Sequence, residues 1–305
     1  MKSALLAILS LWLLAPATAR ELGGRLAGDR HVYKTAGDAE LALYVYKPPG
    51  HKASDQAAAI VFFFGGGWKN GNPRQFEPHC RHLAAKGMVA ITADYRVSSR
   101  HDVKLEDCVA DARSAMRWVR GNAGKLGIDP GRIAAGGGSA GGHLAAAVAL
   151  MDEFDAAGDD DSVSAEPDAM VLFNPALAIA PDEALPDAYN AEIGARLRNR
   201  SHGPVRKVSP LTFAAKKQAP CIMFFGTADK LLAGAEAYRK ESTAAGNECR
   251  IVTYDGQGHG FFNHGKGDNK HYDLTVAEMD RFLEARGFLP APRPATGART
   301  GPAKD

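Results

Sequence analysis

The sequence has few cysteines, little excess charge and few long apolar segments. Its 305 residues include four cysteines (Cys80, Cys108, Cys221 and Cys249) and carry a formal net charge of +2. No C-x-x-C pair is present, which argues against a zinc site. The balanced charge gives no reason to expect a nucleic acid partner. Beyond the N-terminus no apolar run is long enough for a membrane span, so we expect no stable membrane insertion.

The N-terminus has the pattern of a targeting segment. A lysine follows Met1, residues 4–14 are apolar, and Ala17-Thr18-Ala19 forms an A-x-A site. This pattern predicts a signal peptide over residues 1–19 and a secreted or periplasmic protein. Export permits disulfides, and Cys221 and Cys249 each begin a predicted strand, but the four cysteines leave three full pairings open.

The rest of the chain alternates between strand and helix patterns. Alternating residues over 40–47 predict an antiparallel first strand, and continuous apolar runs predict strands buried on both faces. These runs cover 58–64, 88–93, 132–135, 169–173, 221–226 and 250–254, with helices predicted at 75–86, 105–122, 233–244 and 276–286. The alternation predicts an α/β fold, with a mostly parallel central sheet and helices on both faces.

We expect one domain over residues 20–289, with a small cap-like insertion and a disordered tail. Residues 176–208 show no sheet pattern and hold several prolines and arginines. An insertion at this point would lie over the carboxyl ends of the strands, where ligands bind in such sheets. The tail, 290–305, is rich in proline, glycine, alanine and charge.

The sequence around Ser139 combines a strand, a glycine-rich turn and a helix. Gly137-Gly138-Ser139-Ala140-Gly141 matches G-x-S-x-G, the turn that presents a nucleophilic serine at a helix N-terminus. The same glycines also fit G-x-G-x-x-G, a dinucleotide-binding pattern, or a purely structural turn. The residues that follow in the chain bear on this choice.

Three further features supply what a nucleophilic serine needs. Gly65-Gly66-Gly67-Trp68 follows a buried strand, so the N–H groups of Gly66 and Gly67, together with that of Ala140, are candidates for an oxyanion hole. Asp229 and His259 each follow a strand, in the chain order Ser, Asp, His. We therefore predict Ser139, His259 and Asp229 as nucleophile, base and acid, and Trp68 as a substrate-binding residue.

Other residues compete for these roles. Asp255 is a rival acid, although it lies close to His259 in sequence, and His143 is a rival base on the helix after the serine. His264 and His271 suggest a metal site together with His259, but their spacing matches no familiar ligand set. The run of aspartates at 159–161 is interpreted as a solvated loop.

These segments together resemble a known protein family. The stretch 61–68, Asp94-Tyr95-Arg96, the serine turn, Ser209-Pro210-Leu211, 226–229 and 258–261 are similar to α/β-hydrolases of the hormone-sensitive-lipase-like and feruloyl-esterase-like (BD-FAE) types. The resemblance implies the same triad and the same oxyanion donors. The sequence departs from the family pattern at two positions. Phe64 stands where a histidine usually braces the loop, and Gly138 stands where an acidic residue is common.

The expected activity is hydrolysis of carboxylic esters without a metal or an organic cofactor. Export and the resemblance together imply short-acyl esters, such as acetyl or feruloyl groups on plant polysaccharides, as substrates. A serine peptidase of the same fold and a non-catalytic binding module remain as alternatives, and nucleotide binding is a third.

Overall fold

The computed structural model describes residues 26–290. The predicted signal peptide, and all of the predicted tail except Pro290, lie outside these residues. The strands are β1 Asp29–Ala36, β2 Ala39–Tyr46, β3 Ala57–Phe63, β4 Val89–Ala93, β5 Ile128–Gly138, β6 Ala169–Phe173, β7 Cys221–Gly226 and β8 Cys249–Tyr254. The α-helices are α1 Glu77–Ala85, α2 Leu105–Gly121, α3 Ala123–Leu126, α4 Ala140–Leu150, α5 Asp187–Arg196, α6 Leu232–Ala244 and α7 Lys270–Glu284.

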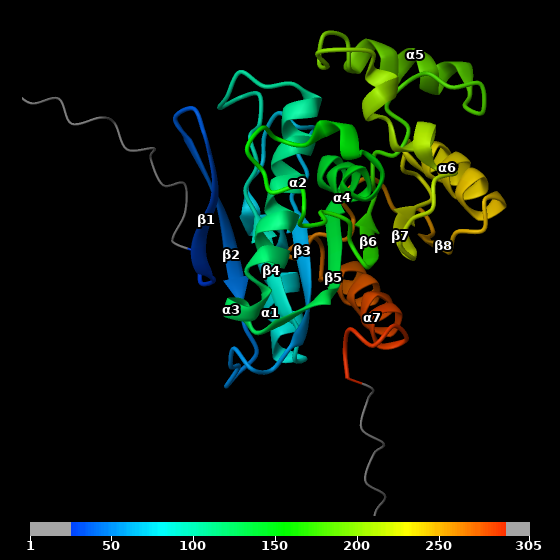
Figure 1. Ribbon diagram of the computed structural model, residues 1–305. Helices are drawn as coiled ribbons and strands as arrows, with labels where there is room; N and C mark the ends of the chain where they lie inside the picture. Colours follow the sequence, from blue (N-terminus) through cyan, green and yellow to red (C-terminus); the bar gives the residue numbers. More distant parts are fainter. Residues whose placement is uncertain (1–25, 291–305) are drawn as a thin grey trace, which may run out of the picture.

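The strands form one sheet in the order β1-β2-β4-β3-β5-β6-β7-β8 (Figure 1). β1 and β2 are antiparallel to their neighbours, whereas the pairs from β4 through β8 are parallel. The predicted α/β fold is thus confirmed. The sequence pattern missed β1, because this edge strand has no buried residue and lacks an apolar face.

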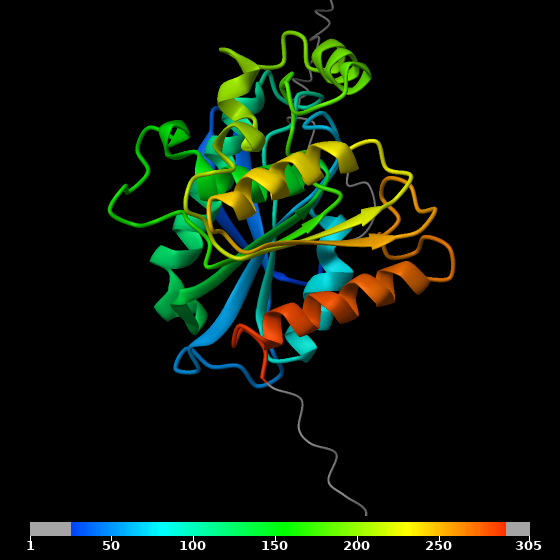
Figure 2. The same ribbon diagram turned by 90° about the vertical axis from the view of Figure 1, so that its right-hand side faces the viewer.

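Helices cover both faces of the sheet, and each face has its own apolar core. In Figure 2, α6 lies above β7 and β8, and α7 lies below them. Successive residues of β3 alternate between the two cores: Val61 packs on the side of α2 and α4, and Phe62 on the side of α1 and α7. Burial on both faces explains why the central strands are continuous apolar runs.

The parallel strands bring several loops to one edge of the sheet. β3, β5, β7 and β8 all end there, followed by the glycine loop, Ser139, Asp229 and His259 respectively. The segment predicted as a cap contains α5, which stands apart from the two helical layers, above α6 in Figure 1. Within residues 26–290, none of the helices has the length and apolar character needed to cross a membrane.

Candidate active site

Ser139 occupies a strained turn between β5 and α4. Its φ of 55° and ψ of −115° are unusual for a residue with a side chain. A Cβ on Gly141 would lie 1.9 Å from the carbonyl oxygen of Phe63, so only glycine allows this approach of α4 to β3. A Cβ on Gly138 would lie 2.6 Å from the ring of Phe262, which explains the absence of an acidic side chain there.

The structure brings Ser139, His259 and Asp229 into one hydrogen-bonded chain. The Ser139 Oγ lies 2.9 Å from Nε2 of His259, and Nδ1 of the same ring lies 2.8 Å from Oδ2 of Asp229. The carboxylate accepts a hydrogen bond from the Nδ1–H group, so Nε2 carries no proton and can accept that of the serine. The Asp229 side chain is 2% exposed, and its second oxygen accepts the N–H of Leu231 at 3.0 Å.

The glycine loop after β3 passes beside Ser139. A Cβ on Gly65 would lie 3.3 Å from the Cβ of Ser139. Gly66 and Gly67 have φ values of 125° and 64°, and a Cβ on Gly66 would lie 2.1 Å from the carbonyl oxygen of Asn70. Within residues 26–290, the N–H groups of Gly66, Gly67 and Ala140 have no backbone hydrogen-bond acceptor, which leaves them available to a ligand.

Phe64 and Gln75 brace this loop in place of the histidine common in the family. The Phe64 ring stacks on Tyr95 at 4.1 Å between centroids, and the Tyr95 hydroxyl donates to the Phe64 carbonyl at 2.8 Å. Gln75 Oε1 accepts the N–H of Gly65 at 2.6 Å, and its Nε2 donates to Asn263 at 2.8 Å. Asn263 in turn donates to the Gly260 carbonyl at 2.9 Å. A single amide side chain thus joins the glycine loop to the loop of His259.

Trp68, the last residue of the glycine loop, is buried and is not among the residues that line the cavity described below. It is 3% exposed, and its indole N–H donates to Nδ1 of His143 at 3.2 Å. His143 Nε2 lies 2.7 Å from the Val208 carbonyl, so this nitrogen carries the ring proton. Burial lowers the pKa of His143 to about 4. The predicted substrate contact of Trp68 is therefore replaced by a bracing role, and the rival base His143 is its partner.

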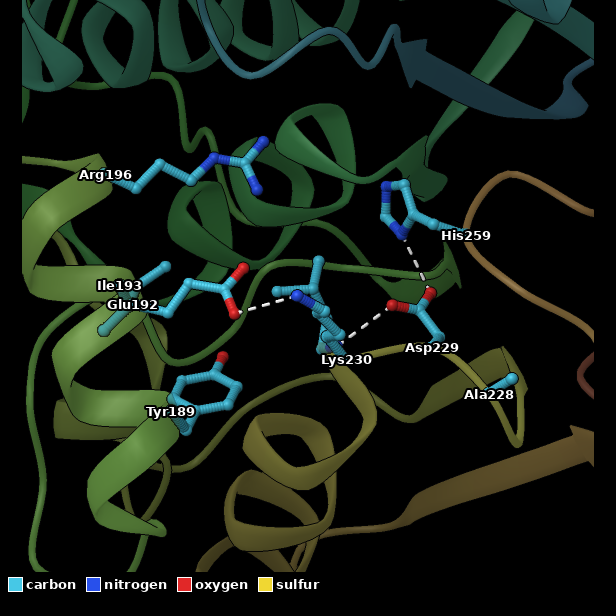
Figure 3. Close-up of a pocket in the computed structure, with 9 residues that line it drawn as sticks. Tyr189, Glu192, Ile193, Arg196, Ala228, Asp229, Lys230 and His259 are labelled. Carbon is cyan, nitrogen blue, oxygen red and sulfur yellow. Dashed lines mark hydrogen bonds and ion pairs between the residues drawn. The ribbon is translucent and has the colours of Figure 1, made fainter.

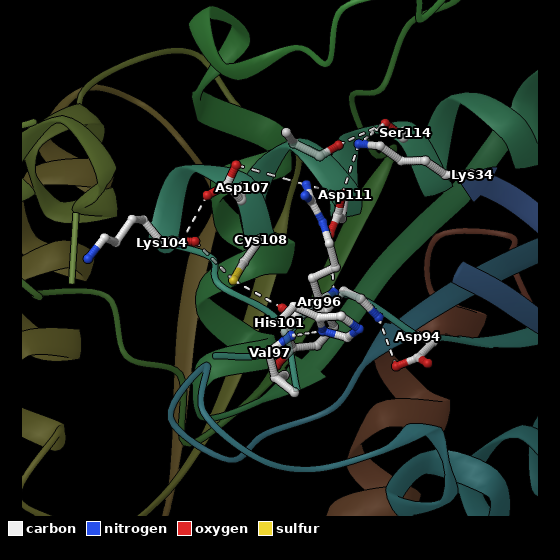
Figure 4. Close-up of polar contacts among 12 residues, drawn as sticks. Lys34, Asp94, Arg96, Val97, His101, Lys104, Asp107, Cys108, Asp111 and Ser114 are labelled. Atoms are coloured by element: carbon white, nitrogen blue, oxygen red, sulfur yellow. Dashed lines mark hydrogen bonds and ion pairs between the residues drawn. The ribbon is translucent and has the colours of Figure 1, made fainter. Parts of the chain in front are cut away.

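A polar network joins the segment after β4 to α2 and β1 (Figure 4). The fully buried Asp111 accepts from Arg96 at 2.8 Å and pairs with Lys34 at 2.8 Å. The bond between Asp111 and Arg96 holds the segment after β4. In this segment the Ser98 N–H donates to the Trp68 carbonyl at 3.0 Å. The Asp94-Tyr95-Arg96 motif is thus a support for the glycine loop.

The residues that compete with the triad lie elsewhere. Asp255 accepts from the Thr227 hydroxyl at 3.2 Å, and the rings of His264 and His271 pack against Tyr272 and Tyr254. No group of three or more potential ligands within residues 26–290 is arranged to hold a metal ion. Cys221 and Cys249 are register partners in β7 and β8, but all four cysteines are free thiols.

A cavity of about 340 Å³ opens beside His259, between α5 and the loop after β7 (Figure 3). Its lining comprises Tyr189, Glu192, Ile193, Arg196, Ala228, Asp229, Lys230, Leu231 and His259. The sequence pattern predicts an insertion here but identifies none of its cavity-lining residues. Asn174 was also missed: it is fully buried, and its Oδ1 accepts the N–H of Gly260 at 3.1 Å, which orients the histidine loop. Its only sequence signal was its place between a strand and Pro175.

Comparison with known proteins gives one family match. The profile of a family described as alpha/beta hydrolase fold matches residues 60–263. Carboxylesterase NlhH of Mycobacterium tuberculosis is 35% identical over 113 residues, which are 37% of this chain and 34% of that protein. The matched part therefore spans about a third of the length of this curated relative.

Solved structures match over a larger part of the chain. The apo form of Thermogutta terrifontis esterase 2 is 44% identical, with a TM-score of 0.83, and the match covers 90% of this chain and 100% of that one. A propionate-bound structure of the same esterase is 45% identical, with a TM-score of 0.81 and coverage of 88% and 97%.

Proposed function

Because the chain belongs to the α/β-hydrolase fold family, we propose that it is a serine carboxylesterase that acts on short-acyl esters. The observation that carries the proposal is the pair of hydrogen bonds that join Ser139 to His259 and His259 to Asp229, at 2.9 and 2.8 Å. This arrangement suits removal of the proton from the serine hydroxyl by the imidazole.

In the proposed reaction Ser139 Oγ attacks the ester carbonyl while His259 Nε2 takes its proton. The N–H groups of Gly66, Gly67 and Ala140 hold the negative charge that develops on the carbonyl oxygen. His259 then gives its proton to the leaving alcohol as the carbon–oxygen bond breaks. A water molecule, deprotonated by the same ring, hydrolyses the acyl-serine and returns the enzyme to its initial state. Asp229 stabilises the imidazolium in both steps.

Two observations support short acyl groups. The cavity of about 340 Å³ is at the small end for ligand sites. Structures of the Thermogutta esterase contain propionate or butyrate. We extend the proposal to acetyl and feruloyl esters of plant polysaccharides and to export. The polysaccharide substrates and the export rest on the sequence patterns. N-terminal sequencing of protein from the culture medium or periplasm tests the export.

Hydrolysis of p-nitrophenyl acetate, butyrate and octanoate tests the function. We expect turnover that falls with chain length, and a loss on the order of 10⁶ in kcat for Ser139→Ala. Ser54→Ala, an exposed serine, is the matched control and retains the full rate. Undiminished turnover by Ser139→Ala would refute the assignment.

Covalent labelling gives a second readout that does not depend on the natural substrate. The Thermogutta esterase has been solved phosphorylated by paraoxon. Here we expect paraoxon to release one equivalent of p-nitrophenol per chain, with the phosphoryl group on Ser139. Labelling of any other residue, or of Ser139→Ala to the same extent, counts against the proposed nucleophile.

A further inference from the structure

The cavity beside His259 contains an arginine that no described residue binds through a hydrogen bond or an ion pair. Arg196 lines the cavity from α5, and within residues 26–290 it makes no ion pair or hydrogen bond. The other cation of the lining, Lys230, is paired with Glu192 at 3.1 Å. Asp229 is engaged by His259. Arg196 is therefore the cation of this lining that no carboxylate of the described chain pairs with (Figure 3).

The guanidinium lies close to a predicted oxyanion donor. Its Nη2 is 3.6 Å from the point where a Cβ on Gly67 would stand. A group bound by Arg196 is therefore separated from a carbonyl held at Gly66 and Gly67 by only a short carbon chain.

Contacts at the C-terminal end of α5 and just after it hold Arg196 in this place. Ile193 and Leu197 are buried on either side of it. Directly after α5, the Arg200 carbonyl accepts the N–H of Leu105 at 2.9 Å, and the Arg200 side chain donates to the Gly67 carbonyl at 3.2 Å. Since the segment after α5 contacts α2 and the glycine loop, Arg196 is positioned by elements that also form the site.

We propose that the site selects esters that carry a carboxylate a few bonds from the scissile carbonyl, and that Arg196 binds this carboxylate. The proposal rests on the esterase function above and names its substrate class. A planar guanidinium binds a carboxylate through two parallel hydrogen bonds, which suits this group better than a neutral chain. The carboxylate belongs either to the acid half or to the alcohol half of the ester.

Matched pairs of esters test the proposal in a pH-stat. Monoethyl succinate against ethyl succinamate places the charge on the acid half, and acetoxyacetate against acetoxyacetamide places it on the alcohol half. We expect the wild type to favour the anionic member of one pair by about tenfold in kcat/KM, mainly through KM. Arg196→Gln removes this preference, Arg196→Glu reverses it, and added salt weakens it.

Arg198→Gln is the matched control. Arg198 is exposed two residues further along and does not line the cavity, so its loss leaves both rates unchanged. The proposal is overturned if the wild type shows no preference in either pair, if Arg196→Gln retains it, or if Arg198→Gln alters it equally. Serine-dependent turnover of p-nitrophenyl acetate separates these outcomes from failure of the esterase function, in which no ester is hydrolysed.

Discussion

The backbone strain at Ser139 and the burial of Asp229 follow from single residues and their neighbours. Ser139 is held at a φ of 55° because glycines at 137 and 141 let α4 approach β3 closely. Asp229 is almost fully buried, and its two oxygens accept from His259 and from the Leu231 N–H. Asp255, the alternative acid, instead accepts from Thr227.

The comparison of these two acids is a prediction at the scale of the residue. Asp229→Asn cannot hold the imidazole in its working tautomer, so we expect kcat for p-nitrophenyl acetate to fall by about 10⁴. Asp255→Asn removes the same charge one strand away and retains the rate. Circular dichroism of both variants checks the fold. An equal loss in the Asp255 variant would reject the assignment of Asp229.

At the scale of elements, the site depends on contacts between loops that follow different strands. Gln75 lies in the short helical turn before α1, and it accepts from Gly65 in one loop while it donates to Asn263 in another. These bonds fix the position of the predicted oxyanion donors relative to the His259 loop. Gln75 is thus a positioning residue, which acts through the groups that it holds.

We predict that Gln75→Ala lowers kcat by about tenfold or more with little change in KM, because an N–H beside the reacting serine loses its acceptor. Gln75→Glu still accepts from Gly65 but cannot donate to Asn263, so it recovers part of the rate. The control is Gln218→Ala: this glutamine donates to the Ala214 carbonyl at 2.9 Å, distant from the site, so its loss lowers the melting temperature alone. If kcat falls in proportion to the loss of stability in both Gln75→Ala and Gln218→Ala, the positioning role of Gln75 is contradicted.

For the molecule as a whole, two buried histidines link stability to pH. His79 lies among the rings of Phe76, Phe173 and Tyr272, and neither of its nitrogens has a hydrogen-bond partner within residues 26–290. Burial lowers its pKa from 6.5 to about 3, and burial lowers that of His143 from 6.5 to about 4. Both rings therefore stay neutral in the folded protein at pH values where the unfolded chain binds protons.

The sign of the effect follows from this difference in proton binding. Above pH 6.5 neither state is protonated and the full stability is present. As the pH falls from 6.5 towards 4, the unfolded state gains protons first, so each histidine lowers the free energy of unfolding by about 1.4 kcal/mol per pH unit. We predict that His79→Leu reduces this slope in denaturant titrations between pH 7 and 4. His202→Gln, an exposed histidine, leaves it unchanged, and an unaltered slope in His79→Leu would disprove the linkage.

The sequence by itself determined the α/β fold and the order of the residues that carry the site. Apolar runs such as that of β6 are local signals of burial on both faces, and strand, glycine turn and helix around Ser139 form one contiguous motif. The order Ser139, Asp229, His259 predicted their meeting, because parallel strands end at one edge of the sheet. The edge strand β1 was missed because it lacks an apolar face.

Tertiary structure alone decided which side chains surround these groups. The indole of Trp68 is held by His143, and Gln75 replaces the usual histidine as a brace. These contacts join residues 75 and 188 positions apart in the chain. Arg196 reaches the cavity because the end of α5 is held by α2 and the glycine loop. Such contacts join distant segments through single polar groups, so the periodicity of the sequence does not predict them.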